Sequence, residues 1–150
     1  MWMHMPRLPE HSRFPPNLAR ISLSFLSTLD PLPILEQLLH LQSVELSLRS
    51  FMGRKMVCSK GGFPHLRKLI LRSLIELEEW VIEEGSMPCL PTLHIKVCFK
   101  LKEIPEGLKY IISLKELEIS GMDKDWNEKL ESGGESYYKV QHIPSVQFNL

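Results

Sequence analysis

The chain has 150 residues, 43% of them hydrophobic, which suits one folded domain with a sizeable core. Basic and acidic side chains number 18 each, so the formal net charge is zero and no basic excess favours nucleic acid or an anionic membrane as the main partner. No apolar run reaches the length of a signal peptide or a membrane span, so we expect no membrane insertion and a cytoplasmic location.

The cysteines argue against two kinds of stabilising site. There are three, Cys58, Cys89 and Cys98, and no two of them form a CxxC pair. A disulfide framework would need an even number, and a zinc site would need closer pairs. We therefore expect reduced thiols and no metal site.

One spacing of apolar residues recurs through the chain and is clearest around Leu90, Leu93 and Ile95. There, alternation with a period of two residues changes into steps of three, which predicts a short strand followed by a coiled segment with inward side chains. Four other triads keep the same Leu-x-x-Leu-x-Leu core: Leu18, Ile21 and Leu23; Leu41, Val44 and Leu46; Leu66, Leu69 and Leu71; and Leu114, Leu117 and Ile119. The first residues of the five triads are 23, 25, 24 and 24 residues apart, and a sixth triad follows after 29, at Ile143, Val146 and Phe148.

This unit, with a repeat length of roughly 20 to 29 residues, is typical of leucine-rich repeats. We therefore predict an α/β solenoid, a leucine-rich-repeat horseshoe whose concave face is a parallel sheet of about five to six short strands. Its convex segments are expected to be irregular or short helices. Residues 1–150 would form one domain, with a truncated first repeat at 1–13, five repeats over 14–122 and a C-terminal cap at 123–150.

The first residues are interpreted from the regular repeat. Leu8 and Ile104 both stand ten residues before the next triad, and this spacing aligns Trp2 with Cys98. On this alignment the chain begins after the strand of its first repeat, and the strand at 21–23 is left as an open edge. Because a solenoid needs caps on its terminal repeats, we expect the chain to be part of a longer protein.

The connections between the strands are expected to differ from one another. Asp30 as N-cap and Pro31 at the first helical position predict a short helix with Leu35, Leu38 and Leu39 on its apolar face. Glycine and proline in the segment 51–66 predict a loop without a helix.

A helical turn is predicted over 76–83, ending at Gly85. Its glutamates are interpreted as a solvated convex face rather than as a catalytic carboxylate cluster.

The residues after the fifth triad predict a C-terminal cap. It would contain a short helix near 124–131, a turn and a closing strand. Trp126, Tyr137 and Tyr138 are expected to pack over the open core of the last repeat, and the alternative is that the two tyrosines form a ligand platform.

The residues between the triad positions are expected to point outward on the concave face, since side chains alternate along a strand. The candidate binding surface at its centre consists of Lys68, Ile70, Arg72, Thr92, His94, Lys96, Glu116 and Glu118. Arg72 and Lys96 would lie in neighbouring strands, where like charges cost stability, and this favours an acidic partner. The alternative is that solvent screens both charges and nothing binds.

Two residues of the repeat have chemistry of their own, and neither is expected to be catalytic. His94 would be a paired surface histidine, since no nucleophile stands in register with it. Cys98 would be a buried structural thiol at the end of its strand.

Six segments carry a resemblance to a known family: FPPNLARISL, DPLPILEQLLHLQSVELS, GRKMVCSKGGFPHLRKLIL, LEEWVIEEGSMPCL, FKLKEIPEGLKYIISLKELEISGM and YYKVQHIPSVQF. In this order they resemble the C-terminal leucine-rich-repeat region of plant intracellular nucleotide-binding leucine-rich-repeat disease-resistance proteins, most closely the coiled-coil class. The resemblance implies a module that senses pathogen effectors or guarded host proteins. It also implies a contribution to autoinhibition through contact with a nucleotide-binding domain.

The alternative is a general leucine-rich-repeat scaffold for protein interaction that is unrelated to immunity. The sequence contains no G-x-x-x-x-G-K-[ST] motif, so we expect no nucleotide cofactor bound in that way, and we expect no other cofactor. No nucleophile elbow and no metal-ligand spacing stand out either, so we do not expect an enzyme.

Overall fold

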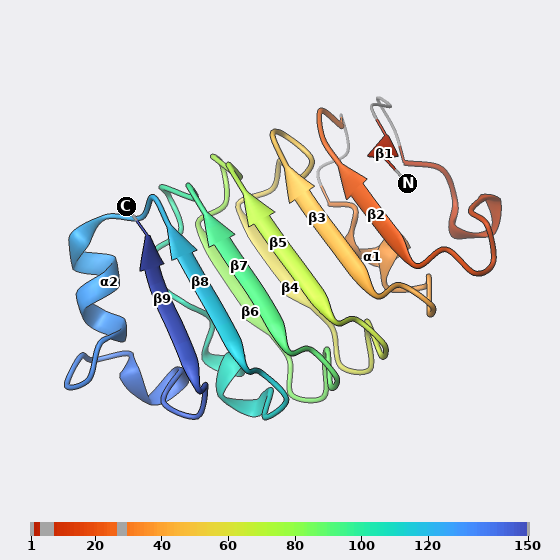
Figure 1. Ribbon diagram of the computed structural model, residues 1–150. Coiled ribbons are helices and arrows are strands. Elements are labelled where there is room, and N and C mark those ends of the chain that lie inside the picture. Colours follow the sequence, from red (N-terminus) through yellow and green to blue (C-terminus); the bar gives the residue numbers. More distant parts are fainter. Residues whose placement is uncertain (1, 4–7, 27–29, 150) are drawn as a thin grey trace.

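The computed structural model describes residues 2–3, 8–26 and 30–149, which form a solenoid with one long parallel sheet (Figure 1). The sheet has seven strands in the order β1-β2-β3-β5-β7-β8-β9. These strands are β1 (Trp2–Met3), β2 (Arg20–Leu23), β3 (Ser43–Ser47), β5 (Lys68–Arg72), β7 (Thr92–Lys96), β8 (Glu116–Ser120) and β9 (Ser145–Asn149). The predicted leucine-rich-repeat solenoid is confirmed.

The apolar triads make the inner face of this sheet. The register places the middle residues of the triads opposite one another, and the same holds for the last residues. In β7, for example, Leu93 and Ile95 are both 0% exposed. Burying one leucine side chain is worth about 1.5–3 kcal/mol, so the stacked triads are a main source of stability.

A residue with left-handed backbone follows five of the strands at one equivalent position. The residues are Phe25, Leu48, Ser73, Val97 and Gly121, with φ between 38° and 65°. The N–H of each donates to a carbonyl at the end of the neighbouring strand, as from Val97 to Ser120 at 2.9 Å. These bonds continue the ladder beyond the strands while the chain turns away from the sheet.

The opposite wall of the solenoid contains a second, two-stranded parallel sheet of β4 (Lys55–Cys58) and β6 (Glu79–Ile82). It lies behind β5 and β7 in the view of Figure 1. The helical turn predicted over 76–83 is therefore wrong, and the loop predicted over 51–66 contains a strand. Trp80 and Ile82 are buried and alternate with outward residues, a period of two that matches a strand rather than a helix.

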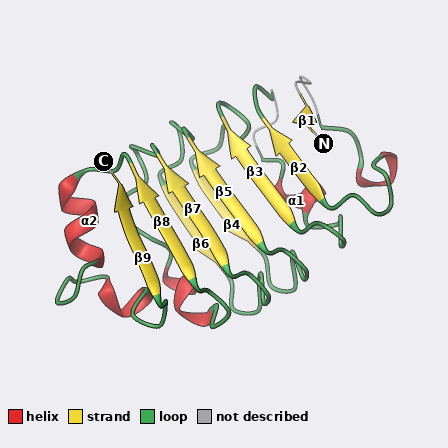
Figure 2. Ribbon diagram, viewed as in Figure 1, coloured by secondary structure: helices red, strands yellow, loops and turns green. Residues whose placement is uncertain are grey.

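The other connections are helical and short, as Figure 2 shows in red. They are η1 (His11–Arg13), α1 (Leu32–Leu35), η2 (Glu106–Tyr110), α2 (Lys124–Leu130) and η3 (Tyr137–Lys139). No helix in the described part of the chain has the length and apolar character needed to cross a bilayer.

The helix predicted from Asp30 is confirmed, but α1 is shorter than expected. The N-cap is Pro31 and the first helical residue is Leu32, each one residue later than predicted. Asp30 Oδ1 accepts the N–H of Leu32 at 2.9 Å. Leu35 is fully buried, whereas Leu39 is 55% exposed, so the predicted apolar face does not extend to Leu39.

The segment 123–149 contains the predicted short helix, α2, and a closing strand, β9. Asp123 Oδ1 accepts the N–H of Trp126 at 2.7 Å at the start of α2, and Trp126 is only 5% exposed. Tyr137 packs against the core, as expected. Tyr138 does not, because it is 46% exposed and its hydroxyl donates to Glu106.

The N-terminal strand corrects the interpretation of the first repeat. β1 pairs with β2 and places Trp2 opposite Ser22, so the open edge predicted at β2 is wrong. In the register of the sheet, Trp2 is equivalent to His94. Its predicted equivalent, Cys98, lies four residues further along the repeat. Leu8 follows Trp2 by six residues whereas Ile104 follows His94 by ten, so counting backwards from Leu8 gave the wrong register.

Candidate binding surface

The eight residues of the candidate binding surface come from β5, β7 and β8 on the solvent side of the long sheet. They form three rows across these strands: Lys68, Thr92 and Glu116; Ile70, His94 and Glu118; and Arg72, Lys96 and Ser120, which joins the third row. All three strands start at the same repeat position, so their outward residues share a face. The structure thus brings the predicted residues together.

The charges on this face are arranged differently from the predicted basic centre. Arg72 and Lys96 are opposite one another in the register, but their side chains pair with carboxylates on opposite sides. Arg72 Nη2 lies 3.4 Å from Glu45 Oε1 of β3, and Lys96 Nζ lies 3.8 Å from Glu118 Oε1 of β8. The two like charges are therefore each compensated within the sheet, and their repulsion no longer argues for an acidic partner.

Glu118 is the most connected residue of the face. Its Oε1 atom accepts hydrogen bonds from Asn149 Nδ2 at 3.0 Å and Ser120 Oγ at 3.4 Å. Its Oε2 atom points instead toward His94. The sequence interpretation missed Asn149 because it ended the outward ladder at Ser120, although the sixth triad already indicated a further strand.

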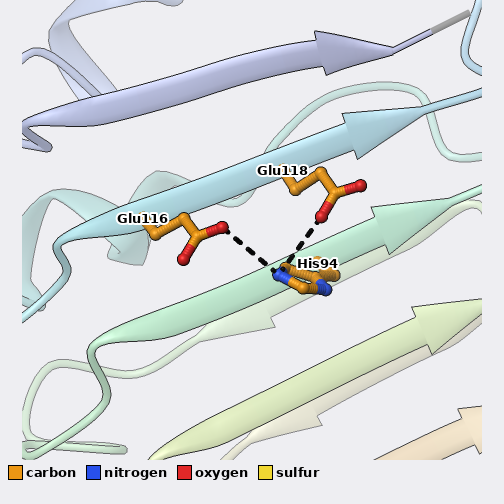
Figure 3. Close-up of side chains that lie close together, drawn as sticks. All are labelled: His94, Glu116 and Glu118. Atoms are coloured by element: carbon orange, nitrogen blue, oxygen red, sulfur yellow. Dashed lines mark ion pairs between the residues drawn. The ribbon is translucent and has the colours of Figure 1, made fainter.

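His94 lies between the two glutamates of β8 (Figure 3). Its Nε2 atom is 3.4 Å from Glu118 Oε2 and 3.8 Å from Glu116 Oε1, and its side chain is only 12% exposed. The expected pairing is present, but the histidine is more buried than a surface residue.

Burial also decides the protonation of this ring. It lowers the pKa of His94 below its ordinary value, and Lys68 and Lys96 lower it further, while Glu118 and Glu116 raise it. The net shift is downward, so the ring is neutral at pH 7 and its contacts with the glutamates are not ion pairs there. Within the described residues, Nε2 is buried and has no hydrogen-bond partner.

Cys58 and Cys98 are buried and behave as structural residues. Cys98 is 0% exposed, its Sγ donates to Lys96 O at 3.5 Å, and burial raises its pKa, as expected for a core thiol. Burial raises the pKa of Cys58 to about 12, and Trp80 Nε1–H donates to its sulfur at 3.4 Å. All three cysteines, including the exposed Cys89, are free thiols.

Known proteins resemble the chain over almost all of its length. It is 58% identical to the Disease resistance protein RPP8 of Arabidopsis thaliana over 147 residues, which is 97% of the chain. It is 60% identical to the Probable disease resistance RPP8-like protein 4 and 59% identical to the Disease susceptibility protein LOV1 of the same plant, again over 97% of the chain. No family model matches the chain.

The chain spans only 16% of the length of each of these three relatives. The match therefore concerns one segment of a much longer protein, and that segment is a run of leucine-rich repeats in the structure described above. Identity of this degree over a whole repeat array is far beyond what a shared repeat pattern alone produces. Over nearly its whole length, the chain is therefore similar to one segment of plant disease resistance proteins such as RPP8.

Proposed function

We propose that the chain is a protein-recognition region of a cytoplasmic plant immune receptor of the coiled-coil class. Its candidate binding surface contacts a pathogen effector or a host protein that the receptor guards. The same repeats contribute to autoinhibition by contacting the nucleotide-binding domain of the receptor. In this proposal residues 14–122 supply the recognition repeats and 123–150 close their core.

The observation that carries this proposal is the alternation of charge across a rigid sheet. Glu45 and Glu118 are the acidic ends of one row from β3 to β8, and basic Arg72 and Lys96 stand between them in the neighbouring row. Each strand is fixed by hydrogen bonds to its neighbours, so these side chains keep their spacing when a partner approaches. Charge patterns of this kind set partner choice and association rate more than they set affinity.

The similarity to known proteins supports the biological setting. The relatives carry the names of disease resistance and disease susceptibility proteins. Leucine-rich repeats fix a shape and leave recognition to surface side chains, which fits a recognition role.

The test is a chimera in which this chain replaces the matching segment of the Arabidopsis protein RPP8. Plants that express the chimera are scored for resistance and for cell death in the absence of a pathogen. We expect a change in the range of pathogens resisted, because recognition follows the surface residues. Cell death without a pathogen would indicate that the contact needed for autoinhibition is lost.

A swapped pair gives the matched control for stability. Arg72→Glu together with Glu45→Arg keeps an ion pair between the two strands but reverses its direction. This double variant should unfold at nearly the same temperature as the unchanged chain and still lose the recognition conferred by the chimera. Lys55→Glu, on the opposite wall, should change neither property. Unchanged resistance in the swapped variant would contradict a role for this surface.

A further inference from the structure

The proposal concerns the cluster of one imidazole and two carboxylates on β7 and β8. His94 Nε2, Glu116 Oε1 and Glu118 Oε2 come from neighbouring strands, and ligand atoms of the three residues all lie within 4.8 Å of one another. We propose that His94, Glu116 and Glu118 form a binding site for a divalent transition metal ion, with zinc as the best match to these ligands. This site stands independently of the proposed receptor function.

The spacing of the three atoms fits a small tetrahedral ion. Zinc binds nitrogen and carboxylate oxygen at about 2.0–2.2 Å, which places two ligands of a tetrahedron about 3.3–3.6 Å apart. The distances from His94 Nε2 are 3.4 Å to Glu118 Oε2 and 3.8 Å to Glu116 Oε1. Because the ligand atoms of the cluster lie within 4.8 Å of one another, the carboxylates would have to move inward to share one ion.

The sheet positions all three ligand residues. Glu116 and Glu118 are two residues apart on β8 and so point to the same side, and His94 is directly opposite Glu118 in the register. All three residues are therefore set by the same ladder that fixes the sheet, and no loop has to close around the ion.

The surroundings of the cluster favour an ion over a simple contact. His94 presents a single nitrogen atom, Nε2, to the carboxylates of Glu116 and Glu118, at 3.8 and 3.4 Å. Its Nε2 atom is buried and lacks a hydrogen-bond partner among the described residues, which costs free energy unless something else occupies the site. A cation would satisfy both the nitrogen lone pair and the two carboxylates.

Glu118 also has the outer hydrogen bonds that orient a metal ligand. Asn149 Nδ2 and Ser120 Oγ donate to its Oε1 atom at 3.0 and 3.4 Å, and this leaves Oε2 free to face His94. Partners of this kind fix ligand orientation in metal sites. Lys96 Nζ lies 3.8 Å from Oε1, on the far side of the carboxylate, and is the main competing positive charge together with Lys68.

The ligand types point to zinc rather than to calcium or magnesium. Calcium and magnesium prefer an all-oxygen shell with six or more ligands, whereas an imidazole with two carboxylates is a ligand set that zinc accepts. Glu116 is 44% exposed, so the fourth position of a tetrahedron opens to solvent. Water fills that position in the simplest case.

The test measures the binding of Zn²⁺ to the full chain after a chelator has removed any bound metal. Isothermal titration calorimetry is run on the Cys89→Ser variant, because the exposed thiol of Cys89 is a competing zinc ligand. We expect one ion per chain. The visible spectrum of bound Co²⁺ should in addition show nitrogen and oxygen coordination without a thiolate band.

Variants separate this site from binding elsewhere. Asn149→Ala should weaken zinc binding about 10- to 100-fold, as loss of an outer partner does, and His94→Gln and Glu118→Gln should each weaken it by more than that. Glu45→Gln removes a carboxylate of the same face outside the cluster and should leave binding unchanged. Thermal unfolding in chelator shows whether each variant is folded, and His94→Asn replaces His94→Gln if the latter is not.

Two results would overturn the proposal. One is a dissociation constant weaker than about 1 mM for the chain with His94, Glu116 and Glu118 intact. The other is one-to-one binding that survives both His94→Gln and Glu118→Gln in folded protein. Neither result would bear on receptor recognition, which the chimera tests separately.

Discussion

Val97 packs a methyl group against the bare Cα of Gly121 in the next repeat: a Cβ on Gly121 would lie 2.9 Å from Val97 Cγ2. Both residues follow their strands with left-handed backbone, at φ 54° and 65°. An alanine at position 121 therefore meets two obstacles, an unfavourable φ and a steric clash. The relationship ties the turns of two adjacent repeats together.

We expect Gly121→Ala to lower the free energy of unfolding by about 2–4 kcal/mol, measured in urea. Gly133 also has a positive φ, 89°, but nothing lies within 4 Å of its added Cβ. Gly133→Ala should therefore lower the free energy of unfolding only by the cost of a left-handed backbone in alanine, about 1–2 kcal/mol. Val97→Ala should recover part of the loss in Gly121→Ala, and strict additivity of the two changes would refute the proposed clash.

Gly107→Ala should destabilise the fold more than Gly121→Ala. A Cβ on Gly107 would lie 1.8 Å from the carbonyl oxygen of Ile82, so η2 and β6 would have to separate. We expect a loss of more than about 4 kcal/mol, or a chain that does not fold. Tyr110→Ala, an exposed change in the same short helix, should cost less than about 1 kcal/mol. Similar unfolding midpoints for the two variants would contradict the close packing.

Leu93→Asp tests the inward direction of the triads. Leu93 is 0% exposed, and a buried, unpaired carboxylate in a stacked array disturbs both neighbouring repeats. We expect loss of the cooperative transition in circular dichroism. Phe99→Asp makes a similar change at a side chain that is 68% exposed in the same repeat, and it should keep the transition. A folded Leu93→Asp protein would refute the assignment of this face.

The three thiols should differ in reactivity. Cys89 is exposed, whereas Cys58 and Cys98 are buried with raised pKa values, that of Cys58 to about 12. Because the thiolate is the reactive form, iodoacetamide at pH 8 should label Cys89 in the native chain and the other two only after unfolding. Peptide mass spectrometry reads the order directly. Early labelling of Cys58 would show that the second sheet opens in the native state.

The hydrogen bond between Tyr138 and Glu106 should stabilise the fold only within a limited range of pH. This bond lowers the pKa of Glu106 from 4.5 and raises that of Tyr138 from 10.0. A lowered acid pKa adds stability that is present above 4.5 and lost as the pH falls through the shifted value. A raised tyrosine pKa adds stability that is present below 10.0 and lost as the pH rises through the shifted value.

The stabilising effect of this contact should therefore be present between these two limits and fade outside them. Tyr138→Phe removes the hydroxyl, so the pKa of Glu106 should move toward its ordinary value in an NMR titration. Lys109→Met should move it as well but by less, since the hydrogen bond from Tyr138 is the larger cause of the shift. An unchanged titration in Tyr138→Phe would show that the contact does not form in solution.

The sheet could be predicted from the sequence because one rule, the spacing of the triads, is repeated in every strand. Each of the six triads has its last two residues in a strand of the long sheet, in the predicted register. The opposite wall follows no such rule. There the segment around Glu79 was predicted as helical from its charged residues, yet pairing with β4 made it a strand. Pairing between distant segments overrides local preference.

The outward rows were predicted correctly as positions, but their electrostatics were not. Row assignment needs only the period of two residues, whereas side-chain direction depends on what each long side chain can reach. Arg72 turns to Glu45 and Lys96 turns to Glu118, and neither choice is visible in a single strand. His94 was predicted to be paired, but its approach to both Glu116 and Glu118 was not, since this combines residues 22 and 24 positions apart.

The opposite wall of the solenoid contains both strands and helices, and this affects the curvature of the repeat array. β4 and β6 are spaced as closely as the strands in front of them, about 4.8 Å, so the solenoid has little reason to bend there. Beyond β6 the opposite wall continues as η2 and then η3, and packed helices need about 8–10 Å. We therefore expect the array to run straight through β3 and β5 and to bend from β7 onward. A partner that covers the whole face would have to be flat at one end and rounded at the other.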